Sequence, residues 1–172
     1  MFLSTVPKIA AVALLVRLLI DCLGDFQHYW ADLFMILAIL SIAVGSLVAL
    51  TQVNIKRMLA YSTISHVGFV LLGFVTGVVE GYGSAVFYVL AYILMSLAAF
   101  GSIIVLNRNG FEADQISDFR GLSKHSPWFA LIMLVVMLSM AGVPPFIGFY
   151  SKLFILQQVV SEGYVILAII AV

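Results

Sequence analysis

Charged side chains are scarce in this sequence, and their scarcity bears on the class of protein. Asp, Glu, Lys and Arg make up 9% of the 172 residues, whereas hydrophobic residues make up 64% and the mean hydropathy is +1.20. Soluble domains carry roughly 25% charged and about 45–50% apolar residues. The composition therefore excludes a soluble fold and indicates a chain embedded in the lipid bilayer.

Cysteine and clusters of metal-binding side chains are also nearly absent. Cys22 is the single cysteine, so the chain cannot form an internal disulfide or a cysteine metal cluster. No histidine and carboxylate cluster has metal-ligand spacing, and no glycine-rich loop suggests a nucleotide, haem or iron–sulfur site. We therefore expect no metal or cofactor-binding residues here. The eight basic residues balance the eight acidic ones, so net charge indicates no partner, and we expect no nucleic acid.

Long apolar blocks dominate the chain and predict membrane-spanning helices rather than barrel strands. A helix needs about 20 residues to cross the hydrocarbon, which leaves room for about five to seven helices. The first and last blocks reach the chain ends, so we expect the sequence to be a piece of a longer protein. The blocks lie near residues 3–22, 31–52, 59–79, 84–106, 127–158 and 163–172.

The fifth block, 127–158, contains the sequence GVPPF at 142–146. Proline removes a backbone donor and clashes with the preceding turn, so we expect the helix to be interrupted there. In lipid the freed carbonyls need protein or water partners, which confines such a break to a bundle interior or a water-filled cavity. Broken helices are typical of transporters. A plain proline kink is about as common, but the nearby Lys152 favours a functional break.

The charges in the connections divide by side of the membrane. Basic residues in short loops stay cytoplasmic, so the loops that carry them are predicted to face the cytoplasm. These basic residues are Lys56, Arg57, Arg108, Arg120 and Lys124, whereas the opposite connections carry Asp21, Asp25, Asp32, Glu80 and Glu162.

The longest connection joins the fourth and fifth blocks. Its apolar residues Phe111, Ile116, Phe119 and Leu122 recur at intervals of three to four residues among charged ones. This spacing predicts a short amphipathic helix at the membrane interface. A solvated loop helix with local ion pairs is the alternative.

Lys8, Arg17 and Lys152 are charged residues within apolar blocks. A charge at the bilayer centre costs roughly 2.5–3.5 kcal/mol on insertion scales, so such residues usually have a function. Arg17 is followed four residues on by Asp21, and pairing or snorkelling would satisfy it. Lys8 and Lys152 have no acidic residue within a helical turn, and burial disfavours the charged form of lysine. Both are therefore candidate proton-transfer residues, although snorkelling towards a headgroup stays open for Lys8.

His66 lies about two turns into the third block, close in sequence to the hydroxyls of Ser62, Thr63 and Ser65. Imidazole titrates near neutral pH and suits a proton relay from the cytoplasmic side. A hydrogen-bonded structural histidine fits the same pattern equally well, so both interpretations stay open.

Two stretches are specific enough to suggest a family. TQVNIKRMLAYSTISHVGF at 51–69 and LSMAGVPPFIGFYSKLFIL at 138–156 resemble signature stretches of the antiporter-like membrane subunits of respiratory complex I, the NADH-quinone oxidoreductase. These subunits are related to the Mrp-type sodium/proton antiporters. The opening FLSTVPKIAAVALLVRL is similar to the subunit N branch. Where subunits L and M place histidines and a lysine in the helix corresponding to 84–106, this chain has the uncharged YVLAYILMSLAAFG.

The resemblance implies an all-α, polytopic transmembrane helix bundle with the antiporter-like inverted-repeat fold and one discontinuous helix. Residues 1–22 then correspond to the last helix of the first repeat, and 31–172 to the second repeat, with its broken helix at about 127–158. Lys8 is implied to be the central lysine of a proton path, and Lys152 the lysine of the broken helix that leads to the outer side. A glutamate and a further lysine of the family belong to upstream helices that this sequence does not include.

The implied function is that of a non-redox subunit of NADH:quinone oxidoreductase, a proton translocase driven by quinone reduction elsewhere in the complex. Electrostatic coupling along a row of intramembrane lysines would move the protons. Quinone and NADH would be used by the whole complex, with no cofactor in this chain. The expected partners are other membrane subunits and the lipid bilayer, and the expected location is the inner membrane of a bacterium. The alternatives are an Mrp-type cation/proton antiporter subunit and a structural subunit without its own proton path.

Overall fold

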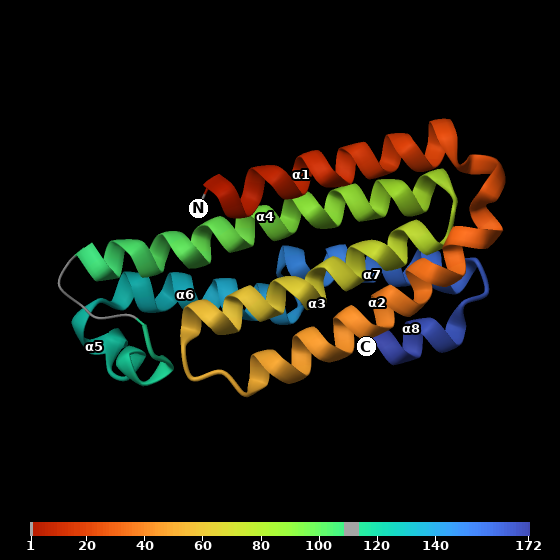
Figure 1. Cartoon of the computed structure of the whole chain (residues 1–172). Helices are drawn as coiled ribbons and strands as arrows, with labels where there is room; N and C mark the ends of the chain where they lie inside the picture. Colours follow the sequence, from red (N-terminus) through yellow and green to blue (C-terminus); the bar gives the residue numbers. More distant parts are fainter. Residues whose placement is uncertain (1, 109–113) are drawn as a thin grey trace.

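Helices account for the apolar blocks in a computed structural model that describes residues 2–108 and 114–172, without the side chains of residues 2–6, 25 and 108. Figure 1 shows the longer helices running roughly side by side. Within the described residues the main helices are α1 (Phe2–Arg17), α2 (Gln27–Leu50), α3 (Ile55–Val75), α4 (Val79–Arg108), α6 (Pro127–Ala141), α7 (Ile147–Ser161) and α8 (Val165–Ala171). Three of them, Gln27–Leu50, Ile55–Val75 and Val79–Asn107, are long and apolar enough to cross a membrane. The all-α fold with its discontinuous helix is thereby confirmed.

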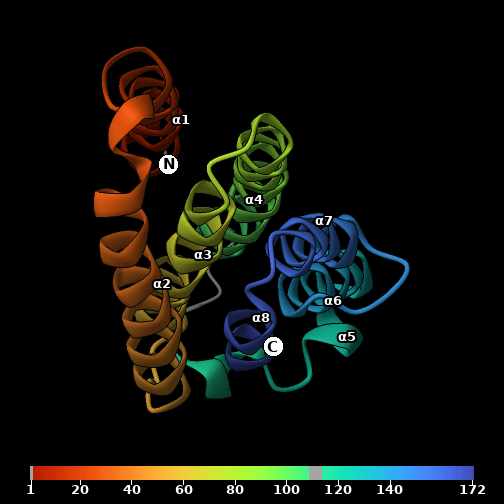
Figure 2. The same ribbon diagram turned by 90° about the vertical axis from the view of Figure 1, so that its right-hand side faces the viewer.

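Helix α4 holds the bundle together because it contacts α1, α3, α6 and α7. The end-on view in Figure 2 shows α2, α3 and α4 in a row, with α1 on one side of α4 and α6 and α7 on the other. Most of the buried apolar side chains come from α3 and α4, including Phe74, Tyr88 and Ile103. Polar groups on the inner faces of α3 and α4 therefore lie between the N-terminal helix and the broken helix.

Asn54 decides where α3 begins. Its side-chain oxygen accepts hydrogen bonds from the backbone nitrogens of Lys56 (3.0 Å) and Arg57 (3.1 Å). Such a cap satisfies backbone donors that have no partner within the helix. The helix predicted near 59–79 therefore starts four residues earlier, at Ile55, and ends at Val75.

The helix interruption predicted at GVPPF is present. Helix α6 ends at Ala141, Gly142 follows with φ of +87°, and α7 begins at Ile147. The nitrogen of Gly142 donates to the carbonyls of Leu138 and Ser139, which satisfies two of the last carbonyls of α6. A residue with a side chain is strained at such a positive φ, so glycine fits this cap.

The charged connections lie at opposite ends of the bundle, as predicted. The chain crosses between ends along α2, α3 and α4, so residues 51–54, the end of α4 and α5 lie towards one end in Figure 1. The other end holds the turns around residues 22–26, 76–78 and 162–164. Which end faces the cytoplasm stays a prediction from the charges.

One local expectation is wrong. Within its described residues, 114–126, the connection after α4 does not form one amphipathic helix: Ile116–Phe119 is a 3-10 turn and Leu122–His125 a short helix, with Gly121 at φ of +78° between them. Phe111 lies outside the described residues. The first apolar block is helical, with α1 over Phe2–Arg17 followed directly by a π-helix over Leu18–Cys22.

Candidate functional site

Lys152 lies on α7, just after the helix break. Its Nζ donates a hydrogen bond to the carbonyl of Ala141 at 3.0 Å and lies 5.1 Å from the centroid of the Phe69 ring. Ala141 is the last residue of α6, so this carbonyl is one of those that a helix end leaves without an intrahelical partner. The break thus supplies a polar contact for the ammonium group inside the bundle.

Lys8 lies on α1 and is half-buried against α4. Its Nζ lies 4.9 Å from the centroid of the Tyr92 ring, a distance at which the ring face attracts a cation. Within the part of the chain that the structure describes, neither Lys8 nor Lys152 has a carboxylate oxygen within 4.0 Å. Both lysines therefore rest on aromatic rings rather than on acidic partners.

His66 is buried on α3, with 8% of its surface exposed. Its Nδ1 is 2.7 Å from the Tyr88 hydroxyl, and its ring centroid is 4.6 Å from that of Tyr92. The hydrogen-bond partner comes from α4, and the hydroxyls of Ser62 and Thr63 instead bond to the carbonyl of Leu59 on their own helix.

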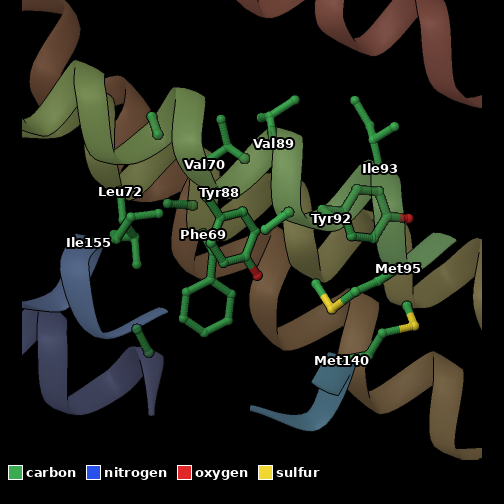
Figure 3. Packing of buried hydrophobic residues seen from close by; sticks show 14 of the residues in the cluster. Phe69, Val70, Leu72, Tyr88, Val89, Tyr92, Ile93, Met95, Met140 and Ile155 are labelled. Atoms are coloured by element: carbon green, nitrogen blue, oxygen red, sulfur yellow. The ribbon is translucent and has the colours of Figure 1, made fainter. Parts of the chain in front are cut away.

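Four rings form a layer between the two lysines, which we call the ring layer: His66, Phe69, Tyr88 and Tyr92. Phe69 stacks on Tyr88 with ring centroids 5.9 Å apart, and His66 contacts both tyrosines. Figure 3 shows Phe69 beside Tyr88, with Tyr92 further along α4. The Lys152 ammonium contacts this layer at Phe69 and the Lys8 ammonium contacts it at Tyr92.

The two tyrosines of the ring layer were missed by reasoning from sequence. The stretch YVLAYILMSLAAFG bears on the prediction only through its lack of charge, and its tyrosines are not among the predicted site residues. Tyr88 and Tyr92 are 1% and 5% exposed, and each hydroxyl has a side-chain partner on α3, His66 or Thr63. The available signal was their spacing of four residues, which places both on one face of a helix.

A cavity of about 410 Å³ reaches this region from the end of the bundle that carries Lys56 and Arg57. Gln52 and Ile116 line it at that end, and His66 and Lys152 line it deeper in the bundle. Ser62 and Ser65 add hydroxyls to a wall that is otherwise mainly apolar. A cavity of this volume with several polar partners can hold water.

A backbone and side-chain clamp stands at the mouth of the cavity. The nitrogen of Ile55 donates to the carbonyl of Asp114 at 3.0 Å, and that of Ile116 to the carbonyl of Val53 at 3.0 Å. Lys56 pairs with the carboxylate of Asp114. The connection after α4 is thereby fixed to the start of α3.

No group of three or more His, Cys, Asp or Glu that could hold a metal ion occurs among the residues that the structure describes. The polar groups that the described site brings together are its lysines, histidine and hydroxyls. These groups exchange protons.

The family described as "NADH:quinone oxidoreductase/Mrp antiporter, TM" matches residues 1–172. A curated relative, NADH-quinone oxidoreductase subunit N of Ruthia magnifica subsp. Calyptogena magnifica, is 70% identical over 169 residues, 98% of this chain. The chain spans 35% of the length of that relative. The resemblance expected from the two signature stretches is confirmed.

Solved structures agree with this family at the level of the fold. The Mrp complex from Dietzia sp. DQ12-45-1b contains a chain with a TM-score of 0.76 and 25% identity, with 86% of this chain and 27% of that chain covered. Respiratory complex I from Thermus thermophilus, with bound aureothin, contains one with a TM-score of 0.69 and 32% identity, with 81% and 31% covered.

Proposed function

The chain belongs to the NADH:quinone oxidoreductase/Mrp antiporter transmembrane family, and from this premise we propose that it is part of a proton-translocating, non-redox subunit of a bacterial NADH-quinone oxidoreductase. Its partners are then the other membrane subunits of that complex, in the bacterial inner membrane. NADH and quinone react elsewhere in the complex. The identity of 70% to a subunit N supports this assignment.

One observation carries the proton-transfer role. Two lysines without acidic partners in the described part of the chain contact the same ring layer, and a cavity with room for water reaches that layer at His66 and Lys152. An intramembrane charge is costly and is retained where it has a function. The arrangement supports a path in which His66 and the two lysines exchange protons.

The path has a direction under this proposal. The cavity extends from His66 to the end predicted to be cytoplasmic, so under this proposal water there delivers protons to His66. Lys8 and Lys152 then influence each other's protonation electrostatically, so that loading one disfavours the charge of the other. Transfer from Lys152 to the outer side rests on the family resemblance alone.

The test uses the full-length subunit in its assembled complex, reconstituted in vesicles. Lys8→Ala and Lys152→Ala are each expected to lower the rate of proton transfer through the subunit by about a hundredfold or more, because a positioned proton carrier contributes that much. Proton pumping is measured per quinone reduced. Lys124→Ala, which removes an exposed lysine of the connection, is the control. Unchanged pumping in both lysine variants contradicts the proposal.

An Mrp-type cation/proton antiporter is the second candidate, favoured by the TM-score of 0.76 to a chain of the Mrp complex. Sodium-dependent proton flux without quinone reductase activity would identify it. A purely structural subunit would tolerate removal of both lysines while the complex still assembles and pumps.

A further inference from the structure

The cavity and Lys8 lie on different sides of the ring layer. Within the described residues, the cavity wall includes His66, Phe69 and Lys152, but neither Lys8 nor Tyr92. The Lys8 ammonium instead lies over the Tyr92 ring at 4.9 Å. Water in the cavity therefore has direct access to Lys152, whereas the tyrosines of α4 stand between that water and Lys8.

The orientation of the Tyr92 ring is set by one hydrogen bond. Its hydroxyl is 2.6 Å from Oγ1 of Thr63, and Thr63 donates its own hydroxyl proton to the carbonyl of Leu59 at 3.0 Å. Because Thr63 has one hydroxyl proton, Tyr92 is the donor in the bond between them. The Tyr92 proton is thus engaged with Thr63 rather than with a lysine or His66.

This pairing distinguishes Tyr92 from Tyr88. The Tyr88 hydroxyl binds Nδ1 of His66, a group that can itself exchange protons. Tyr92 offers His66 only its ring, at a centroid distance of 4.6 Å. Tyr92 is therefore suited to separating groups, and Tyr88 to connecting them.

We propose that Tyr92 is a positioning residue whose ring, locked by Thr63, separates Lys8 from the water of the cavity. The proposal rests on the proposed proton-transfer function. With the bond from Tyr92 to Thr63 in place, no continuous water path joins the cavity to Lys8. Without the bond from Tyr92 to Thr63, water enters between the cavity and Lys8, and protons pass without being coupled to quinone reduction.

The experiment removes the same hydrogen bond from each side, in the full-length subunit within the assembled complex. Tyr92→Phe keeps the ring and its contact with Lys8, and Thr63→Val keeps the volume of the threonine. A hydrogen bond contributes about 1 kcal/mol, which corresponds to about a fivefold change in an equilibrium. Each variant is expected to raise passive proton leak through the complex in vesicles about fivefold and to lower the protons pumped per electron.

The double variant is the sharper measurement. Both changes remove the bond between Tyr92 and Thr63, and Thr63→Val also removes the bond to the carbonyl of Leu59, so the double variant is expected to leak no more than Thr63→Val alone. Thr63→Ser retains the hydroxyl and is expected to keep the leak of the unaltered complex. Tyr82→Phe, a change at another buried tyrosine of α4, is the matched control.

The proposal is overturned if Tyr92→Phe and Thr63→Val have the leak and the proton-to-electron ratio of the unaltered complex. It is also overturned if the increases in leak of the two single variants add fully in the double variant. If Tyr92→Phe does not assemble, Thr63→Val against Thr63→Ser decides. A purely structural role would reduce the amount of assembled complex without changing the leak per complex. If the Lys8 and Lys152 variants still pump protons, the proposed function is overturned. If those variants lose pumping but the Tyr92 and Thr63 variants have normal leak and pumping, only the proposed role of Tyr92 is overturned.

Discussion

The surroundings of Lys152 and of Lys8 differ in how each accommodates an ammonium group inside an apolar bundle. Lys152 donates to the carbonyl of Ala141, which the helix break leaves available, and it lines the cavity. Lys8 lies within α1, directly after Pro7, and rests on the Tyr92 ring. The backbone therefore solvates one lysine, and a side chain from another helix accommodates the other.

This difference shows that a helix break and an aromatic ring can each stabilise a charged group inside an apolar bundle. A charge in a low-dielectric region needs an opposing dipole or a polarisable face close by. The break supplies dipoles next to the cavity, whereas the ring supplies attraction to a cation at a position outside the cavity wall. Lys152 is thus the member of the pair that lines the cavity, and Lys8 the member that does not.

The largest expected effect comes from Lys152→Arg. A guanidinium can still donate to the Ala141 carbonyl, but it does not release its proton in proteins. The complex should assemble normally while proton transfer through the subunit falls by about a hundredfold or more. Assembly is followed by native gel and pumping in vesicles. Normal pumping would show that Lys152 acts through its charge alone and does not itself transfer protons. The difference between the surroundings of Lys152 and Lys8 would then not matter for proton transfer.

His66→Asn tests the imidazole group of the ring layer, which lies between the two lysines. Asparagine can place a polar atom near the position of Nδ1 and keep the bond to the Tyr88 hydroxyl, but it cannot titrate. Because a proton relay must titrate, this change should lower the rate of proton pumping by about tenfold or more. Pumping close to that of the unaltered complex, together with normal thermal stability, would make His66 a structural histidine instead.

Gly142→Ala should affect Lys152 and leave the surroundings of Lys8 unchanged. The added Cβ would lie 3.0 Å from Cδ of Lys152, at a residue whose φ is +87°. A left-handed conformation costs a residue with a side chain about 1–2 kcal/mol. A lower thermal stability and a moderate loss of pumping are therefore expected. The matched change Gly83→Ala, within α4 and with no atom within 4 Å of the added Cβ, should lower neither quantity.

Lys56→Gln is expected to have the smallest effect. It breaks the ion pair with Asp114 at the mouth of the cavity, where the two side chains are 43% and 58% exposed. Exposed pairs contribute about 0–1 kcal/mol, and the two backbone hydrogen bonds of the clamp remain. Stability and pumping should change little, and raising the salt concentration should change them no further. A large loss of pumping would mean that the mouth controls access to Lys152.

Much of the fold follows from the sequence because its causes are local. Pro144, Pro145 and Gly142 act within a few residues, so the break between α6 and α7 could be predicted from them. The connection after α4 was predicted less well. Its apolar spacing suggested a helix, but Gly121 and the bonds from residues 53 and 55 to residues 114 and 116 divide it into short turns.

The candidate site could be predicted only in part. Lys8, Lys152 and His66 stand out from an apolar background, which is why the sequence alone identifies them as candidates. Their partners do not stand out. Tyr88 lies 22 residues from His66 along the chain, and Tyr92 lies 29 residues from Thr63.

From the sequence alone came the membrane class, the helix break, the division of charge between the two ends and the identity of the lysines, since each depends on composition or on the chemistry of neighbouring residues. Tertiary structure decided which ring each lysine contacts, which hydroxyl His66 binds and where the cavity runs. The physical reason is that α3 and α4 are apolar on nearly every face. Such helices carry little periodic signal for their rotation and register, so only packing determines which of their side chains meet.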